Sequence, residues 1–190
     1  MSVETIRVRL TGNRPLLMHS GRLSDPLDDI TRDLAKITGK RGKTAADHEE
    51  IARIEWYGGL WLSEGRPCIP AEAVEASFIA AARARKKAKQ ARAGLMVMAP
   101  CPLDYEGPRD IDKLWQDPAF RLRRSVRVGN ARTIRTRAHF AAWRVDALVS
   151  FVPTLLDRAE ILDIFAIAGS QEGIGDWRPK YGRFTVESIE

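Results

Sequence analysis

The strongest constraint on the fold is a cationic stretch at 121–152, RLRRSVRVGNARTIRTRAHFAAWRVDALVSFV. Between Asp117 and Asp146 the sequence has no acidic residue, whereas it has eight arginines. A run of one charge is usually a disordered tail, but this one carries β-branched residues at strand spacing. It also contains Gly129-Asn130, a pair that closes two-residue hairpins. The stretch therefore predicts a cationic β-hairpin followed by an apolar strand, with an anionic partner against it.

The rest of the composition predicts an ordinary globular protein. No apolar run in the 190 residues reaches the roughly 18–20 residues of a membrane span. The first residues already alternate as in a strand, which argues against a signal peptide. Cys68 and Cys101 lack metal-ligand or CxxC spacing, so we interpret them as small core residues. We expect a cytoplasmic protein, with no membrane partner, no cofactor and no metal.

The distribution of charge is more informative than its total. The formal net charge of +6 is compatible with nucleic acid, an anionic membrane or neither. Basic residues cluster at 83–92 and 121–144, while acidic residues collect at 24–33, 47–55 and 104–117. Clustering of this kind is what the electrostatic footprint of a nucleic-acid-binding protein requires.

Hydrophobic periodicity predicts an α+β fold with six core elements in the order βαββαβ. We expect strands at 3–11, 122–128, 131–151 and 182–188, and helices at 70–92 and 157–168. This order is the ferredoxin-like pattern, which RRM-type modules use to bind single-stranded RNA. No low-complexity linker divides the chain, so we expect one domain over 1–190. An inserted helical segment at about 23–62 and a projecting basic arm at about 121–137 would interrupt it.

The register of the hairpin explains why an arm is expected. Pairing across the turn places Arg127 opposite Arg132 on one face and Arg124 opposite Arg135 on the other. A hairpin that is cationic on both faces would bury one row of unpaired charges if it lay on an apolar core. We therefore expect it to project and to hold a strand or a neighbouring subunit.

A second group of cations lies at the end of the helix expected at 70–92. One interpretation is a solvated last turn whose positive charge suits the helix dipole. The other is a surface that contacts backbone phosphates. The sequence leaves both open for Arg83, Arg85, Lys86, Lys87 and Lys89.

Two further motifs resemble the RAMP superfamily of CRISPR-associated proteins. Residues 64–72, EGRPCIPAE, precede an alanine-rich helix and resemble that family's G-x-P-x-I-P-G-S-S-L-K-G junction, with Ala-Glu-Ala in place of Gly-Ser-Ser. Residues 173–184, GIGDWRPKYGRF, resemble its glycine-rich loop before the last strand, with fewer glycines. The arginine-rich hairpin occupies the place of the hairpin or thumb that such proteins use on RNA. The chain is shorter than a typical Cas7 backbone subunit, and it also resembles small phage and prophage proteins.

The resemblance implies a Cas7-like, phage-encoded protein in the cytoplasm of a bacterial host cell. Such a protein binds single-stranded RNA or DNA and self-associates along the strand into a filament or ring. In the loop at 173–182, glycines allow close approach to a phosphate; alternatively they supply positive φ while Trp177 fills the core. The residues expected to bind nucleic acid are Arg83, Arg85, Lys86, Lys87, Lys89, Arg121, Arg123, Arg124, Arg127, Arg132, Arg135, Arg137, Trp177, Arg178 and Lys180.

Two other functions stay open. The first is a Cas6-like metal-independent endoribonuclease, for which His19 is the histidine placed to act as general acid or base. Asp25 corresponds in place to a cleaving aspartate of some Cas7-type subunits, but it serves a helix N-terminus equally well. The second is a protein-binding decoy that inhibits a CRISPR complex. Because the sequence has no evident triad or paired catalytic carboxylates, we prefer binding to catalysis.

Overall fold

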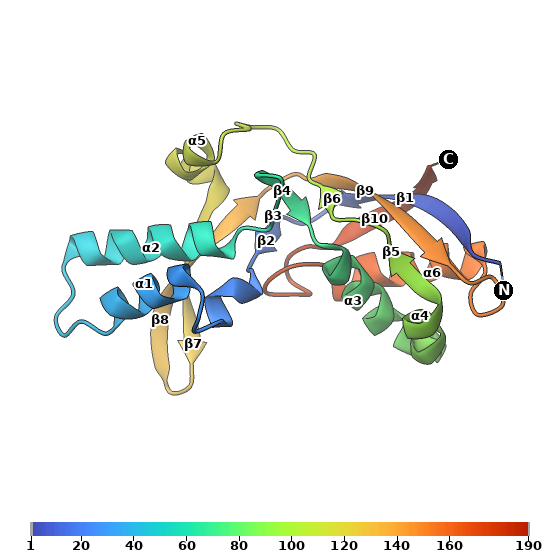
Figure 1. Ribbon diagram of the computed structural model, residues 1–190, viewed down its shortest axis with the longest axis horizontal. Coiled ribbons are helices and arrows are strands. Elements are labelled where there is room, and N and C mark those ends of the chain that lie inside the picture. The colour runs from blue at the N-terminus through green and yellow to red at the C-terminus, as the bar shows by residue number, and fades with distance from the viewer. Residues whose placement is uncertain (1, 190) are drawn as a thin grey trace. The chain divides into compact units, whose positions relative to one another are not determined.

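The computed structural model describes residues 2–189, and these residues have the predicted α+β structure (Figure 1). They form two compact units. Unit 1 contains the chain up to Leu16, Leu62–Glu106 and the chain from Ala141 on; unit 2 contains Leu17–Trp61 and Gly107–Phe140. Nearly all of the segment expected as an insertion, and all of the expected arm, thus belong to unit 2. The single-domain assignment stays a prediction.

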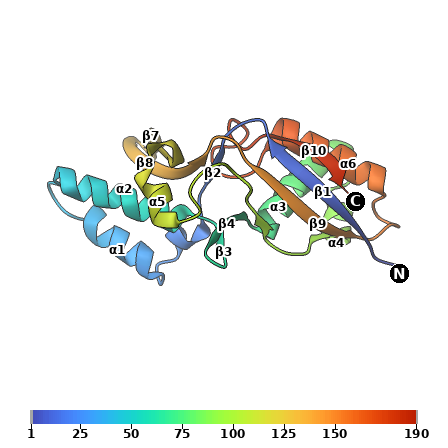
Figure 2. The same cartoon turned by 90° about the horizontal axis from the view of Figure 1, so that it is seen from above.

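Unit 1 is built on a four-stranded antiparallel sheet in the order β10-β1-β9-β5. Its strands are β1 (Glu4–Gly12), β5 (Leu95–Val97), β9 (Arg144–Phe151) and β10 (Phe184–Ile189). The helices α3 (Ala71–Ala82) and α6 (Arg158–Ile167) contact each other and the strands β5 and β10, respectively. Figure 2 shows β1 and β9 side by side, with these helices on one side of the sheet.

The alternation predicted for the first strand is present in β1. Ile6, Val8 and Leu10 are buried, and the residues between them are exposed or half-buried. The alternation in β9 is as regular, with apolar side chains at every second position buried. Between the helices, the rings of Phe78 and Phe165 lie 4.7 Å apart between centroids. Burial of these side chains drives the folding of unit 1.

The predicted hairpin strands are present, but most of their residues lie in a different sheet from the one expected. The strand expected at 122–128 and the first part of the strand expected at 131–151 form a separate sheet, and only the last part, Arg144–Phe151, joins the sheet of unit 1. Its remaining strands are Leu95–Val97 and Arg144–Phe151, and the single long strand expected from 131 is interrupted at 141–143. The reason lies in the side chains: β5 offers Leu95 and Val97 for burial, whereas the hairpin has arginines on both faces.

The long helix expected at 70–92 is also interrupted. It ends in a 3₁₀ turn at Arg83–Arg85 and resumes as α4 (Ala88–Gly94). At the break, Lys86 has a φ of 57°. The backbone N–H of Lys86 donates to Arg83 and that of Lys87 to Ala82. These two bonds are those of a Schellman motif, so the lysine occupies a left-handed position that usually belongs to glycine.

A short sheet, β3-β4-β6, completes unit 1. It consists of β3 (Leu62–Ser63), β4 (Arg66–Ile69) and β6 (Cys101–Pro102). Cys68 and Cys101 are buried free thiols here, and burial raises the pKa of Cys101 to about 12. A thiol with so high a pKa is a poor nucleophile, which agrees with the core role predicted for it.

Unit 2 combines three helices with the sheet β2-β8-β7. Its elements are β2 (Leu16–Met18, of which Leu16 is counted with unit 1), α1 (Asp29–Thr38), α2 (Ala45–Gly59), α5 (Ile111–Gln116), β7 (Arg121–Val128) and β8 (Ala131–Phe140). Helix α2 contacts both α1 and β8. It begins with a capping box formed by Thr44 and Asp47. The indole Nε1–H of the buried Trp56 on α2 donates to the carbonyl of Phe120 at 2.8 Å, which ties the helix to the start of the hairpin.

Candidate functional site

The candidate site is the arginine hairpin, by which we mean β7, β8 and the turn between them. Its register is the predicted one, with Arg124 paired with Arg135 and Arg127 paired with Arg132. Gly129 has a φ of 59°, as a tight turn of this kind requires. Arginines therefore project from both faces of a two-stranded ribbon, and hydrogen bonding between the strands fixes their spacing.

The base of the hairpin is anchored by a buried carboxylate. Glu55 on α2 is 2% exposed. Its Oε1 accepts a hydrogen bond from Nη1 of Arg135 at 2.6 Å, and its Oε2 accepts one from the backbone N–H of Thr136 at 2.8 Å. The projecting arm was expected because burying unpaired arginines is costly. At the base of the hairpin, Glu55 pairs with Arg135 and so removes that cost for this arginine.

The remaining arginines of the hairpin fall into two groups. Arg137 is buried, and Arg121 is half-buried with its guanidinium over the ring of Trp115, at 4.7 Å from the ring centroid. Four others are exposed, and none of them forms an ion pair with a carboxylate of residues 2–189. Two of the four donate to backbone carbonyls, Arg124 to that of Arg123 and Arg127 to that of Gly129. These four are Arg123, Arg124, Arg127 and Arg132.

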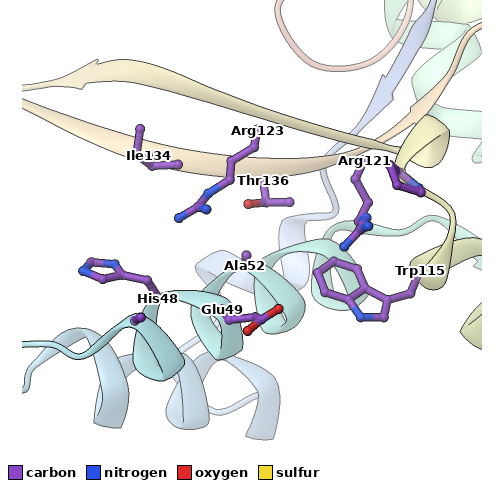
Figure 3. A pocket seen from close by; sticks show the side chains of 10 residues that line it. His48, Glu49, Ala52, Trp115, Arg121, Arg123, Ile134 and Thr136 are labelled. Atoms are coloured by element: carbon purple, nitrogen blue, oxygen red, sulfur yellow. The ribbon is translucent and has the colours of Figure 1, made fainter.

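A groove of about 810 Å³ lies within unit 2, between α2 and the hairpin face that carries Arg121 and Arg123 (Figure 3). The figure shows both arginines and Thr136 pointing from the hairpin toward α2, where His48 and Glu49 line the opposite wall. The full lining comprises Ala45, His48, Glu49, Ala52, Trp115, Pro118, Arg121, Arg123, Ile134 and Thr136. We refer to this feature as the hairpin groove.

Two buried polar atoms in the hairpin groove have no hydrogen-bond partner among the described residues. They are Oγ1 of Thr136, a residue that is 2% exposed, and Nε of Arg121. Leaving a buried polar group unpaired costs about 1–3 kcal/mol. The groove therefore carries polar groups that the described fold does not satisfy.

An aromatic cluster supports one end of the hairpin groove. The ring of Trp115 lies 5.5 Å from that of Trp56 and 6.0 Å from that of Tyr57, between centroids. The hydroxyl of Tyr57 donates to Asp112 at 2.5 Å. Burial, together with this bond, raises the pKa of Tyr57 to about 12, so the phenol is neutral at physiological pH. These contacts fix Trp115, and with it the guanidinium of Arg121.

The second predicted group lies in unit 1, and we call it the helix-end cluster: Arg83, Arg85, Lys86, Lys87 and Lys89. Helix α6 neutralises two of its members. Arg85 binds Asp163 through two bonds of 2.7 and 2.9 Å, and Lys87 lies 2.8 Å from Glu160. These cations hold the pKa of both carboxyl groups below their ordinary values. Within residues 2–189 the other three members form no ion pair.

The glycine-rich loop of unit 1 has the positive φ values of one interpretation but not its buried tryptophan. Gly173 and Gly182 have φ values of 75° and 69°, so its glycines supply positive φ. The side chain that fills the core is Ile174, however, and not Trp177. Trp177 is half-buried with its ring 5.8 Å from that of Tyr181. The two cations expected to bind beside it, Arg178 and Lys180, are exposed.

The two catalytic candidates, His19 and Asp25, both lie in unit 2. His19 is half-buried and follows β2 directly. Asp25 is exposed, and its Oδ1 accepts a hydrogen bond from the backbone N–H of Leu27 at 2.9 Å. The helix N-terminus is capped by Asp28 instead. Over residues 2–189, no three His, Cys, Asp or Glu side chains are grouped so that they could hold a metal ion.

Sequence reasoning missed three residues of this site: Glu55, Trp115 and Thr136. The sequence analysis searched for exposed cations, and none of these three residues is cationic. Glu55 and Thr136 are also buried, and Trp115 is half-buried. A signal for Glu55 was present nonetheless, because it is a glutamate flanked by Ile54 and Trp56 in a helix. A carboxylate in such surroundings requires a cationic partner.

Comparisons with known proteins add no family to this description: no protein-family model matches the chain, and no curated protein matches it. In the part of the chain that the structure describes, no helix has both the length and the apolar character needed to span a membrane.

Proposed function

We propose that the protein binds single-stranded nucleic acid, RNA or DNA, through the arginine hairpin and largely without sequence preference. The observation that carries this proposal is the set of four exposed arginines that form no ion pair with a described carboxylate, Arg123, Arg124, Arg127 and Arg132. Uncompensated guanidinium groups repel one another, and phosphates relieve that repulsion while releasing counterions. Contacts to phosphate carry no sequence information.

The fixed geometry of the hairpin further supports the proposal. Strand pairing sets Arg127 opposite Arg132, and the pair from Glu55 to Arg135 holds the base of the ribbon against α2. The cations are therefore presented at fixed spacing, which lowers the conformational entropy lost when a strand binds. Proteins that bind single strands combine such a basic surface with aromatic or guanidinium platforms. Trp115 beside the hairpin and Arg121 at its first position provide that combination.

The direct test is the binding of fluorescently labelled oligouridine and oligothymidine, followed by anisotropy from about 50 to about 200 mM salt. If the four arginines each contact a phosphate, log K falls with log salt concentration with a slope of about −3, at roughly −0.7 per contact. Absence of binding at low salt, or binding that salt does not weaken, contradicts the proposal. A duplex of the same length serves as the control for strand type.

We extend the proposal to the architecture and the assembly. The order β1, α3, β5, β9, α6, β10, with sheet order β10-β1-β9-β5, supports a ferredoxin-like core in unit 1. Together with the junction at 64–72 and the loop at 173–184, this supports a RAMP-type, Cas7-like phage protein that acts in the bacterial cytoplasm. Such a protein self-associates along its strand. Light scattering tests this, because the mass of the complex should then rise stepwise with oligonucleotide length, and a constant mass contradicts it.

A further inference from the structure

The two unsatisfied polar atoms of the hairpin groove point to a bound molecule. Oγ1 of Thr136 and Nε of Arg121 are buried without a partner among residues 2–189. Buried polar groups of native proteins are nearly always hydrogen-bonded. Both atoms belong to side chains that line one groove and point toward α2 (Figure 3). A ligand in the groove would supply an acceptor for Nε of Arg121 and a hydrogen-bond partner for the hydroxyl of Thr136. The long side chain of Arg123 would move aside to admit it.

The second feature is a guanidinium held in a fixed place. Arg121 lies over the ring of Trp115, and Trp115 is itself packed against Trp56 and Tyr57. Nucleobases stack on guanidinium planes as well as on aromatic rings. The guanidinium of Arg121, held in place by Trp115, is therefore the group in the hairpin groove best suited to stack against a flat ring.

The charges in the hairpin groove indicate what else the ligand carries. Arg123 extends into the groove and forms no ion pair with a described carboxylate, so it is available to a phosphate. Glu49 lies on the opposite wall and can accept hydrogen bonds from the N–H groups of a base, which a simple anion lacks. The volume of about 810 Å³ falls within the roughly 300–1,000 Å³ of small-molecule sites.

From these observations we infer that the hairpin groove binds one nucleotide, with its base against Arg121 and its phosphate toward Arg123. The shared chemistry is that of a nucleoside monophosphate, either free or within a strand. The strand form rests on the proposed function, whereas the free form does not. Thr136 hydrogen-bonds the base or the sugar. An oxygen of the sugar or phosphate, lying in the plane of the Arg121 guanidinium, accepts from Nε, because a ring stacked on that plane cannot.

The test is a titration of ¹⁵N-labelled protein with AMP, CMP, GMP, UMP and inorganic phosphate, followed by NMR. The reporter is the indole N–H of Trp115, assigned with Trp115→Phe. We expect a saturable shift with at least one nucleotide. Thr136→Val removes the hydroxyl at nearly constant shape and raises the dissociation constant about fivefold. Thr133→Val, on the same strand but the opposite face, is the matched control and leaves it unchanged.

A second variant guards against a folding defect in the first. Arg121→Lys keeps the charge but loses both the plane and Nε, so it weakens nucleotide binding by a similar factor. Both variants are compared with the wild type by their amide spectra before titration.

If free nucleotides give no saturable shift but Thr136→Val weakens oligonucleotide binding about fivefold, the groove takes a nucleotide only within a strand. If phosphate alone reproduces the shift, or if Thr136→Val changes neither affinity, the inference is overturned. When the inference is overturned in this way, salt-dependent binding of a single strand by the wild type still supports the proposed function. If the wild type then binds no strand at all, the proposed function is overturned as well.

Discussion

The helix-end cluster and the arginine hairpin are alike in sequence but differ in what their own chain does with the charge. In the helix-end cluster, Arg85 and Lys87 are neutralised by carboxylates of α6. In the hairpin, an ion pair joins Arg135 to Glu55. This pair anchors the base of the ribbon. The four exposed arginines of the hairpin form no ion pair with a described carboxylate.

The difference shows that a cluster of cations in a sequence marks a binding surface only when its counter-charges are absent. Acidic residues distant in sequence decide this, and composition does not reveal them. Asp163 lies 78 positions from Arg85. Exposed ion pairs of this kind contribute little to stability, about 0–1 kcal/mol, but they occupy the donors that a phosphate would need.

The largest expected effect concerns the anchor of the hairpin. Replacing the buried carboxylate (Glu55→Ala) leaves Arg135 and the N–H of Thr136 without their partner, so we expect a loss of about 2–4 kcal/mol in the free energy of unfolding. Urea denaturation measures it. Glu49→Ala removes an exposed glutamate of the same helix and should change stability by less than about 0.5 kcal/mol. Equal losses in the two variants would show that Glu55 is no anchor.

A pair of double variants tests the comparison between the two clusters in binding. Arg127→Ala with Arg132→Ala removes two uncompensated charges, so the affinity for a labelled single strand should fall about tenfold at low salt. Arg85→Ala with Lys87→Ala removes the same charge from pairs that are already neutral and should cost less than about threefold. Anisotropy gives both values. If the second variant loses more affinity than the first, the comparison is reversed.

The helix-end cluster can also be released from its counter-charges. Asp163→Asn with Glu160→Gln keeps the side-chain shapes but frees Arg85 and Lys87, so we expect strand affinity to rise by about two- to threefold at low salt. Because the pKa of both carboxyl groups is lowered, the wild-type pairs persist at neutral pH. They are lost only as the pH falls below about 4. Unchanged affinity would mean that the helix-end cluster has no access to a strand.

The smallest effect is expected at the left-handed lysine. Lys86→Gly relieves the strained φ of 57° and should stabilise the protein by about 0.5–1 kcal/mol, visible as a rise in Tm. It also removes a cation of the helix-end cluster, yet strand affinity should change by less than about twofold. A fall in stability would argue against the Schellman geometry at this break.

Local pattern was sufficient to predict the α+β class and the hairpin. The alternation in β1, the turn at Gly129 and the opposition of Arg124 and Arg135 all follow from period and turn chemistry. These features depend on residues close together in sequence, for which the side-chain period of two leaves little choice of register.

The sheet partners and the groove depend on distant contacts, which local pattern does not encode. The three-residue strand β5 is a weaker signal in the sequence than the hairpin, but it offers Leu95 and Val97 for burial without placing arginines on both faces. The break at Lys86 placed a lysine where glycine is the usual residue. The groove needs α2, α5 and the hairpin together, so Trp115 and Thr136 could not be assigned to it before the fold was known.

The central claim is that the arginine hairpin holds a single strand through its uncompensated charges. Its most direct test is the salt dependence of oligouridine binding by the wild type and by Arg127→Ala with Arg132→Ala. Each phosphate contact contributes roughly 0.7 to the slope of log K against log salt concentration. We predict that the slope of the double variant is shallower by about 1.4. A slope equal to that of the wild type would contradict the claim.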